Sequence, residues 1–103
     1  MAQRTSKALC AAQARSLMDI PNIGVALAAD LRSLGIATPE AVRHMHPMRA
    51  YEALRTPMGK RHDPCVLDVF LAAHDFMNGG AAQPWWAFTA QRKKLIALEK
   101  EKA

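Results

Sequence analysis

One stretch decides the fold of this chain: Leu17-Met18-Asp19-Ile20-Pro21-Asn22-Ile23-Gly24-Val25-Ala26-Leu27-Ala28. Its pattern predicts that a helix ends, that the chain turns around Pro21 within about four residues, and that a second helix begins at Gly24. Ile20 and Ile23 are expected to anchor the turn in the core. Asn22 suits the turn because Asn adopts a positive φ more readily than most residues.

The spacing of Ile20, Pro21, Ile23, Gly24 and Ala28 matches the helix-hairpin-helix pattern. The free N–H groups that open the second helix, at the positive end of its dipole, suit a phosphate oxygen. Contacts of this kind hold a protein on nucleic acid without reading its sequence. The pattern therefore predicts backbone contacts to DNA from Asn22, Ile23, Gly24, Val25 and Ala26. The alternative is a structural hairpin, which Ala26 favours because DNA-binding hairpins often carry Lys or Arg near that position.

The pattern of the rest of the chain also predicts helices. Apolar residues recur at spacings of three and four between turn residues, and no four-residue stretch alternates as a half-buried strand does. Helices are expected at residues 6–18, 25–34, 39–44, 47–56, 64–77 and 84–101. Thr38 and Asp63 each precede a proline and supply N-caps, and Gly35 and Gly79 supply stops. We expect an all-α, SAM-like compact bundle of about five or six short helices, with the helix at 64–77 at its centre.

Size and composition exclude several classes of protein. At 103 residues, 50% hydrophobic and 22% charged, the chain is expected to form one globular domain, with a core at about 6–92 and a basic C-terminal helix and tail at 84–103. A net charge of +5 favours an anionic partner, nucleic acid first. The absence of a signal-like or membrane-spanning stretch predicts a cytoplasmic protein that does not bind membranes.

Basic residues form two groups along the sequence. The first group lies at residues 43–62 and the second at 92–102, with three aspartates and no cation at 63–80 between them. Supporting contacts to DNA are expected from Arg43, Lys60, Arg61, Arg92, Lys93 and Lys94. Trp85 and Trp86 precede the second group, which suits either stacking on unpaired bases or contact with a protein partner. Because adjacent helical residues point about 100° apart, one Trp is expected to pack on the domain and the other to lie at its rim.

Cys65 is a candidate for a reactive side chain. It lies in the first turn of its helix, where the pKa of a thiol is lowered, although Asp63 opposes the effect. The sequence leaves open a reactive thiol or a small buried side chain. A metal site from His62, Cys65 and His74 is not expected, because His74 lies nearly opposite Cys65 around the helix. No nucleophile elbow, phosphate-binding loop or spaced carboxylate pair is present, so we expect a protein that is not an enzyme and has no cofactor.

Four segments together resemble a known family: Ile20 to Gly24, Asp30 to Ile36, His62 to Phe70 and Pro84 to Thr89. They resemble the small bacterial helix-hairpin-helix proteins of the pathogenicity-locus family, some of which are labelled mitomycin-resistance proteins, and the similarity spans residues 17–92. The first half is also similar to the C-terminal domain of TfoX-type competence regulators. The sequence departs from the family at His46, where Asp is expected, and at Arg55, where relatives carry Cys.

The resemblance implies a helix-hairpin-helix fold, association with DNA and no established reaction. Our leading hypothesis is a non-sequence-specific DNA-binding protein linked to DNA damage tolerance. The alternative is an adaptor or regulator that contacts a protein through the Trp85 and Trp86 region. Whether the expected cations share a face with the Gly24 turn distinguishes the two hypotheses. If the cations are scattered over the surface, the adaptor gains support.

Overall fold

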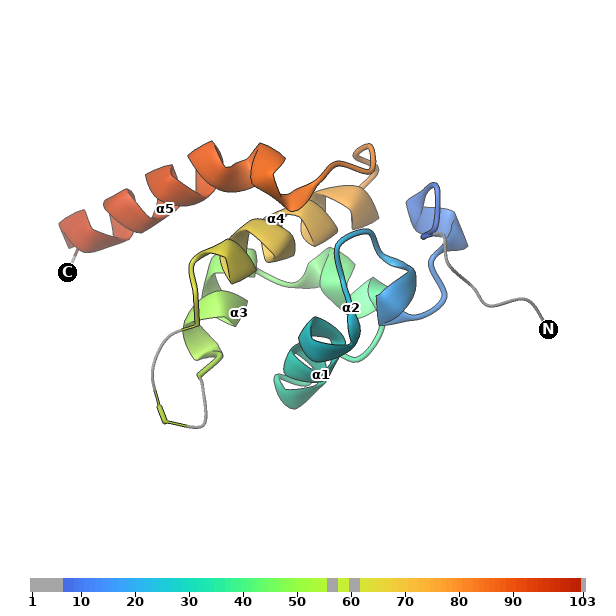
Figure 1. Ribbon diagram of the computed structural model, residues 1–103, viewed down its shortest axis with the longest axis horizontal. Coiled ribbons are helices and arrows are strands. Elements are labelled where there is room, and N and C mark those ends of the chain that lie inside the picture. Colours follow the sequence, from blue (N-terminus) through green and yellow to red (C-terminus); the bar gives the residue numbers. More distant parts are fainter. Residues whose placement is uncertain (1–6, 56–57, 60–61, 103) are drawn as a thin grey trace.

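The described part of the chain is helical throughout. The computed structural model describes residues 7–55, 58–59 and 62–102, and no β-strand occurs among them. Figure 1 shows the helices in chain order: η1 (Ala11–Gln13), η2 (Leu17–Asp19), α1 (Val25–Ser33), α2 (Pro39–His44), α3 (Pro47–Ala53), α4 (Cys65–Met77), η3 (Trp85–Phe88) and α5 (Thr89–Lys102). The expected all-α bundle of short helices is confirmed. Within this part of the chain, no helix is long and apolar enough to span a membrane.

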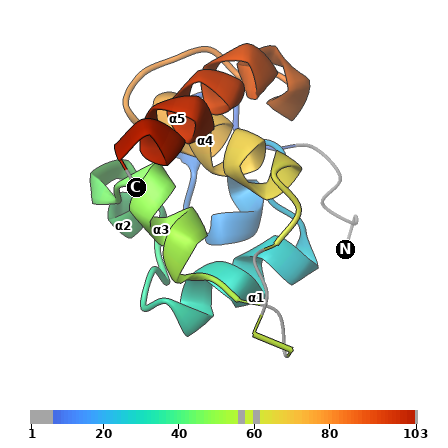
Figure 2. The same ribbon diagram turned by 90° about the vertical axis from the view of Figure 1, so that its left-hand side faces the viewer.

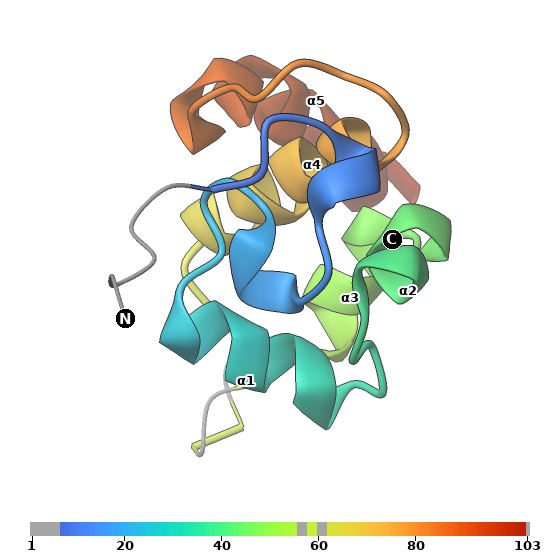
Figure 3. The ribbon, with the colours of Figure 1, turned by 90° about the vertical axis from the view of Figure 1, so that its right-hand side faces the viewer.

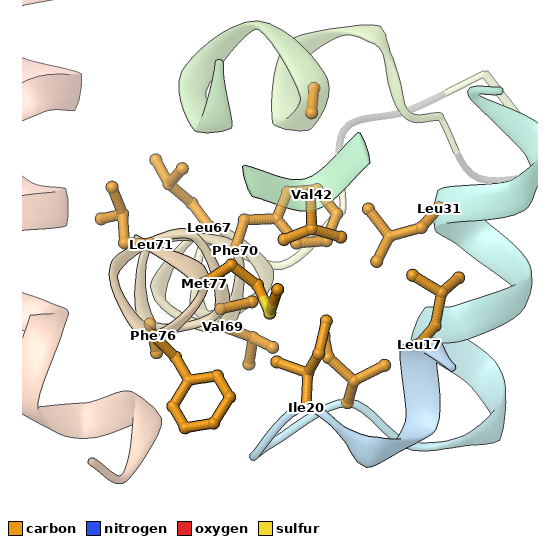
Figure 4. Packing of buried hydrophobic residues seen from close by; sticks show 14 of the residues in the cluster. Leu17, Ile20, Leu31, Val42, Leu67, Val69, Phe70, Leu71, Phe76 and Met77 are labelled. Carbon is orange, nitrogen blue, oxygen red and sulfur yellow. The ribbon is translucent and has the colours of Figure 1, made fainter. Parts of the chain in front are cut away.

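Helix α4 forms the centre of the domain, as expected. Leu67, Phe70 and Ala73 are completely buried, and the surrounding helices point apolar side chains at α4 (Figure 4). Helices α1 and α5 lie on opposite sides of α4 in all three ribbon views (Figures 1, 2 and 3). Any surface that combines α1 with α5 must therefore extend around α4.

The expected helix boundaries hold where local signals set them. The Thr38 hydroxyl accepts a hydrogen bond from the Ala41 N–H at 3.1 Å and so caps α2. After α1, Gly35 has a φ of 84°, and the Ile36 N–H donates to the Leu31 carbonyl at 2.9 Å. This is the bonding of a Schellman stop, in which a left-handed glycine lets the next residue satisfy a carbonyl near the helix end.

The helix expected at residues 6–18 is wrong for the residues described. Residues 7–19 form the two short turns η1 and η2, with Cys10 and Ser16 in extended conformation before them. The Asp19 carboxylate accepts hydrogen bonds from the Arg15 and Ser16 N–H groups, and the Ala8 N–H donates to the Asp19 carbonyl at 2.9 Å. These bonds fold the segment back on itself and compete with a helix that is short and marginal. The first helix of the expected hairpin is thus one 3-10 turn.

Two other boundaries differ in detail. Helix α3 ends at Ala53, three residues before the expected end, because Leu54 is extended with a ψ of 133°. The segment expected as one helix at 84–101 begins as the 3-10 turn η3 and continues as α5. On α4, Asp68 and Ala72 are also buried. The α5 side of α4 is therefore covered as well.

Candidate nucleic-acid interface

The turn between η2 and α1 has the geometry that its sequence predicts. The Ile23 N–H donates to the Ile20 carbonyl at 3.2 Å, closing a four-residue turn. Asn22 occupies its third position with a φ of 74°, as the type II turn requires. Ile20 and Ile23 are completely buried, so the turn is fixed to the core on both sides, as expected.

The N-terminus of α1 is open to solvent. Gly24 is its N-cap and supplies no side-chain cap, and a Cβ built on Gly24 would meet no atom within 4 Å. Gly24 and Ala26 are exposed, and Val25 is 72% exposed. The N–H groups of a helix's first turn have no partner within the helix, and they attract anions together with the helix dipole. The expected phosphate position is therefore accessible.

Lys7 is a cation beside this turn that sequence reasoning missed. Its ammonium donates to the Ile23 carbonyl at 2.6 Å and to the Met18 carbonyl. Burial lowers the pKa of Lys7, and the charge of Asp19 partly offsets that effect. The sequence did not indicate Lys7 as a contact, because Lys7 was expected to lie in a helix at residues 6–18. Only the fold-back of residues 7–19 brings it under the turn.

The turn is also tied to the segment that leads into η3. The Asn22 side-chain amide donates to the Gln83 carbonyl at 2.8 Å, across 61 residues of sequence. Beyond Gln83, Trp85 packs against the core, whereas Trp86 is 63% exposed. The two rings are 5.5 Å apart at 83°. The expectation of one packed and one rim Trp is confirmed.

The expected supporting cations do not gather at the turn. Arg43, on α2, pairs with Glu40 at 3.4 Å. Lys93 and Lys94 are exposed on α5, which lies across α4 from α1 (Figure 3). Lys60 and Arg61 lie outside the described residues. The described members of this set are thus distributed over separate elements, and the adaptor alternative gains support.

Arg92 is held in a buried ion pair. Asp68 is completely buried on α4, where its carboxylate accepts hydrogen bonds from Arg92 Nε at 2.8 Å and from the Thr89 hydroxyl at 2.7 Å. The hydrogen bond to Asp68 is the main cause that raises the pKa of Arg92. The charged guanidinium of Arg92 therefore holds α5 on α4 through Asp68. No sequence pattern indicates this pair, because Asp68 and Arg92 are 24 residues apart.

The environment of Cys65 opposes a reactive thiolate. The Asp63 carboxylate caps the helix start by accepting the Cys65 N–H at 3.0 Å. A hydrogen bond to Asp63, burial and the charge of Asp63 raise the pKa of the Cys65 thiol above its ordinary value. The lowered pKa that a helix N-terminus predicts is therefore outweighed by the neighbouring carboxylate. Of the two interpretations that the sequence leaves open, this geometry favours the unreactive side chain.

Comparison with known proteins identifies the family. The sequence profile of the family described as "Pathogenicity locus" matches residues 10–94. The chain belongs to the pathogenicity-locus family. It is also 36% identical over 83 residues to the mitomycin resistance protein McrB of Streptomyces lavendulae, an alignment that covers 81% of this chain and 79% of that relative. No solved structure matches the chain. The expected similarity to TfoX-type regulators stays a prediction.

Proposed function

We propose that this pathogenicity-locus protein contributes to drug resistance or DNA damage tolerance by binding the backbone of DNA at the turn between η2 and α1. The observation that carries the proposal is the open N-terminus of α1, where Gly24 leaves the first-turn amides uncapped. The mitomycin resistance protein named above, at 36% identity, supports the biological role. The positive φ of Asn22 in the turn supports the proposal, although the element before the turn is one 3-10 turn and not the expected helix.

In this proposal a phosphate oxygen accepts hydrogen bonds from the N–H groups of Val25 and Ala26. The helix dipole and the Lys7 ammonium, which is bonded to the Ile23 carbonyl, add positive potential at the same place. The exposed side chains beside Gly24 are Val25 and Ala26, which have no hydrogen-bonding groups that read base edges. The proposed binding is therefore independent of DNA sequence and involves no reaction, so the protein acts by binding and not as an enzyme.

The test is fluorescence anisotropy with labelled single-stranded, duplex and nicked DNA over a salt series. Each phosphate neutralised on duplex DNA contributes about −0.9 to the slope of log affinity against log salt. Gly24→Glu places a carboxylate at the amides, and Gly24→Gln is its neutral control of similar size. The open space at Gly24 accommodates both side chains. We expect Gly24→Glu to lose binding while the Gly24→Gln control keeps most of it, with both variants folded.

A second candidate function, a protein adaptor, is supported by a different observation. Arg43 is paired with Glu40 and Arg92 with Asp68, so the cations available to DNA are fewer than the net charge suggests. Trp86 is at the same time largely exposed, as aromatic anchors of protein interfaces are before binding. Absence of DNA binding at low salt, for every DNA form tested, would refute the first function and favour the adaptor.

A further inference from the structure

An apolar groove lies on a different part of the surface from the η2–α1 turn. It encloses about 500 Å³ between the C-terminal end of α1, helix α2 and helix α3. Its apolar lining includes Leu34, Ile36, Met45 and Ala50. Figure 2 shows α2 and α3 next to each other, with the segment that follows α1 below them. The volume falls within the range of about 300–1,000 Å³ typical of binding pockets.

The ionisable side chains that line this groove are all basic. They are His44, His46 and Arg49 among the described residues, and no carboxylate lines the groove there. Arg49 is exposed. Glu40, on α2, is bonded to His44 at 2.8 Å and to Arg43, and Glu52 and Glu99 line the neighbouring groove. Arg49 and His46 are therefore the basic side chains that can meet a ligand in this groove.

His46 uses one ring nitrogen to cap α3. It is the N-cap of α3, and its Nδ1 atom accepts the Arg49 N–H at 3.4 Å. An imidazole that accepts at Nδ1 carries its proton at Nε2, which is then a donor. His46 therefore replaces the Asp expected at this cap. The replacement exchanges a negative charge for a neutral donor beside the groove.

The occupant must match both the apolar lining and the basic edge. A helix that places apolar residues three and four positions apart in a groove is a recurrent mode of protein recognition. Carboxylates beside that stripe would meet Arg49 and His46. A second copy of this chain is disfavoured because each copy has a net charge of +5, and like charges across an interface are repulsive.

We propose that the groove between α1, α2 and α3 binds an acidic amphipathic helix of a partner protein. The apolar stripe of that helix packs on Leu34, Ile36 and Met45, and its carboxylates pair with Arg49 and His46. This site is separate from the proposed DNA contact at Gly24. Binding of the helix therefore does not depend on whether the protein binds DNA.

The probes are two synthetic amphipathic helices with the same stripe of leucines. One carries glutamates beside the stripe and its twin carries lysines. Anisotropy of the labelled peptides, without DNA, measures affinity for the full chain, and amide shifts in NMR spectra locate the contact. We expect the glutamate peptide to bind, with shifts centred on α2 and α3, and the lysine twin to bind at least about tenfold more weakly. Rim charges at exposed positions each contribute up to about fivefold.

A variant with a reversed charge gives the most direct test of the proposed pairing. Arg49→Glu changes an exposed side chain and is expected to keep the fold while reversing the preference between the two peptides. Ala53→Glu adds a carboxylate to the groove and should weaken the glutamate peptide. Leu9→Glu, at an exposed position before η1, adds the same charge outside the proposed site and should change little.

Four results would overturn the proposal. The first is equal affinity for the two peptides, or no binding of either. The second is an unchanged preference in the folded Arg49→Glu variant. The third is an effect of Leu9→Glu as large as that of Ala53→Glu, because the added charge would then not act locally at the groove. Displacement of the glutamate peptide by a short alkyl carboxylate at comparable concentration would identify a small-molecule site instead.

Discussion

Removing Arg92 should be the most damaging single change among the polar residues described. Asp68 is completely buried, and it accepts hydrogen bonds from Arg92 and Thr89 at 2.8 and 2.7 Å. Replacing Arg92 by Leu leaves a buried carboxylate without its cation. Breaking a buried ion pair in this way costs about 3–5 kcal/mol. A domain of this size is stabilised by about 5–15 kcal/mol in total, so the loss is a large fraction of its stability.

Urea denaturation followed by tryptophan fluorescence measures the effect, because Trp85 packs against the core. The Arg92→Leu variant should lose about 3–5 kcal/mol of unfolding free energy, and Thr89→Val about 1.5–3 kcal/mol, as expected for a hydrogen bond to a charged group. Adding Asp68→Leu to Arg92→Leu should restore much of the loss, since replacing both partners by apolar residues is often nearly neutral.

The double variant is what distinguishes this explanation from simple loss of packing. If Arg92→Leu costs less than about 1 kcal/mol, the pair behaves as an exposed salt bridge and the reasoning is wrong. If the double variant is as unstable as the sum of the single ones, the two residues do not interact. If the Arg92→Leu variant is stable but loses DNA binding, Arg92 contacts DNA, as the sequence predicts.

Four further predictions concern the turn and the titratable groups. Gly24→Ser should stabilise the fold by a few tenths of a kcal/mol by adding an N-cap oxygen, while lowering DNA affinity because the hydroxyl occupies the amides; thermal melts and anisotropy measure the two effects. Asn22→Ala should cost about 1–2 kcal/mol because alanine resists a φ of 74°, whereas Asn22→Gly should cost less in the same melts. Alkylation of Cys65 at neutral pH should be slower than that of an unstructured thiol, and Asp63→Asn should accelerate it; equal rates before and after that substitution would contradict the assigned cause. Burial lowers the pKa of His74, so its contribution to stability is complete above the unfolded pKa of about 6.5 and is lost as pH falls through the folded value; His74→Gln should flatten urea stability between neutral and mildly acidic pH.

The sequence predicted most where structure is determined locally. Helix α2 has the expected bounds because Thr38 and the proline after it act on their immediate neighbours. The turn conformation of Asn22 could likewise be predicted, since it follows from the residue's own tolerance of positive φ. At Gly35 and Gly79, left-handed glycines end helices as expected.

Prediction failed where side-chain hydrogen bonds or the packing of distant residues determine the outcome. The Asp19 carboxylate and its carbonyl draw residues 8, 15 and 16 away from helical bonding, a competition that apolar spacing does not reveal. The burial of Asp68 depends on α5. The distribution of Arg43, Lys93 and Lys94 over separate elements also follows only from how the helices pack. For that reason the sequence predicted the candidate contact at the turn, but it did not predict which cations lie near the turn.

The central place of α4 has a consequence for how the chain is made. Helices α1, α2 and α3 are complete at Ala53, but the side chains they bury, such as Leu31 and Val42, pack towards α4, which ends at Met77 (Figure 4). A ribosome adding about 5–20 residues per second needs roughly 1–5 s to cross that interval. During this time the emerging half of the protein has its apolar side chains exposed, and nascent-chain binding factors have a defined interval in which to engage it.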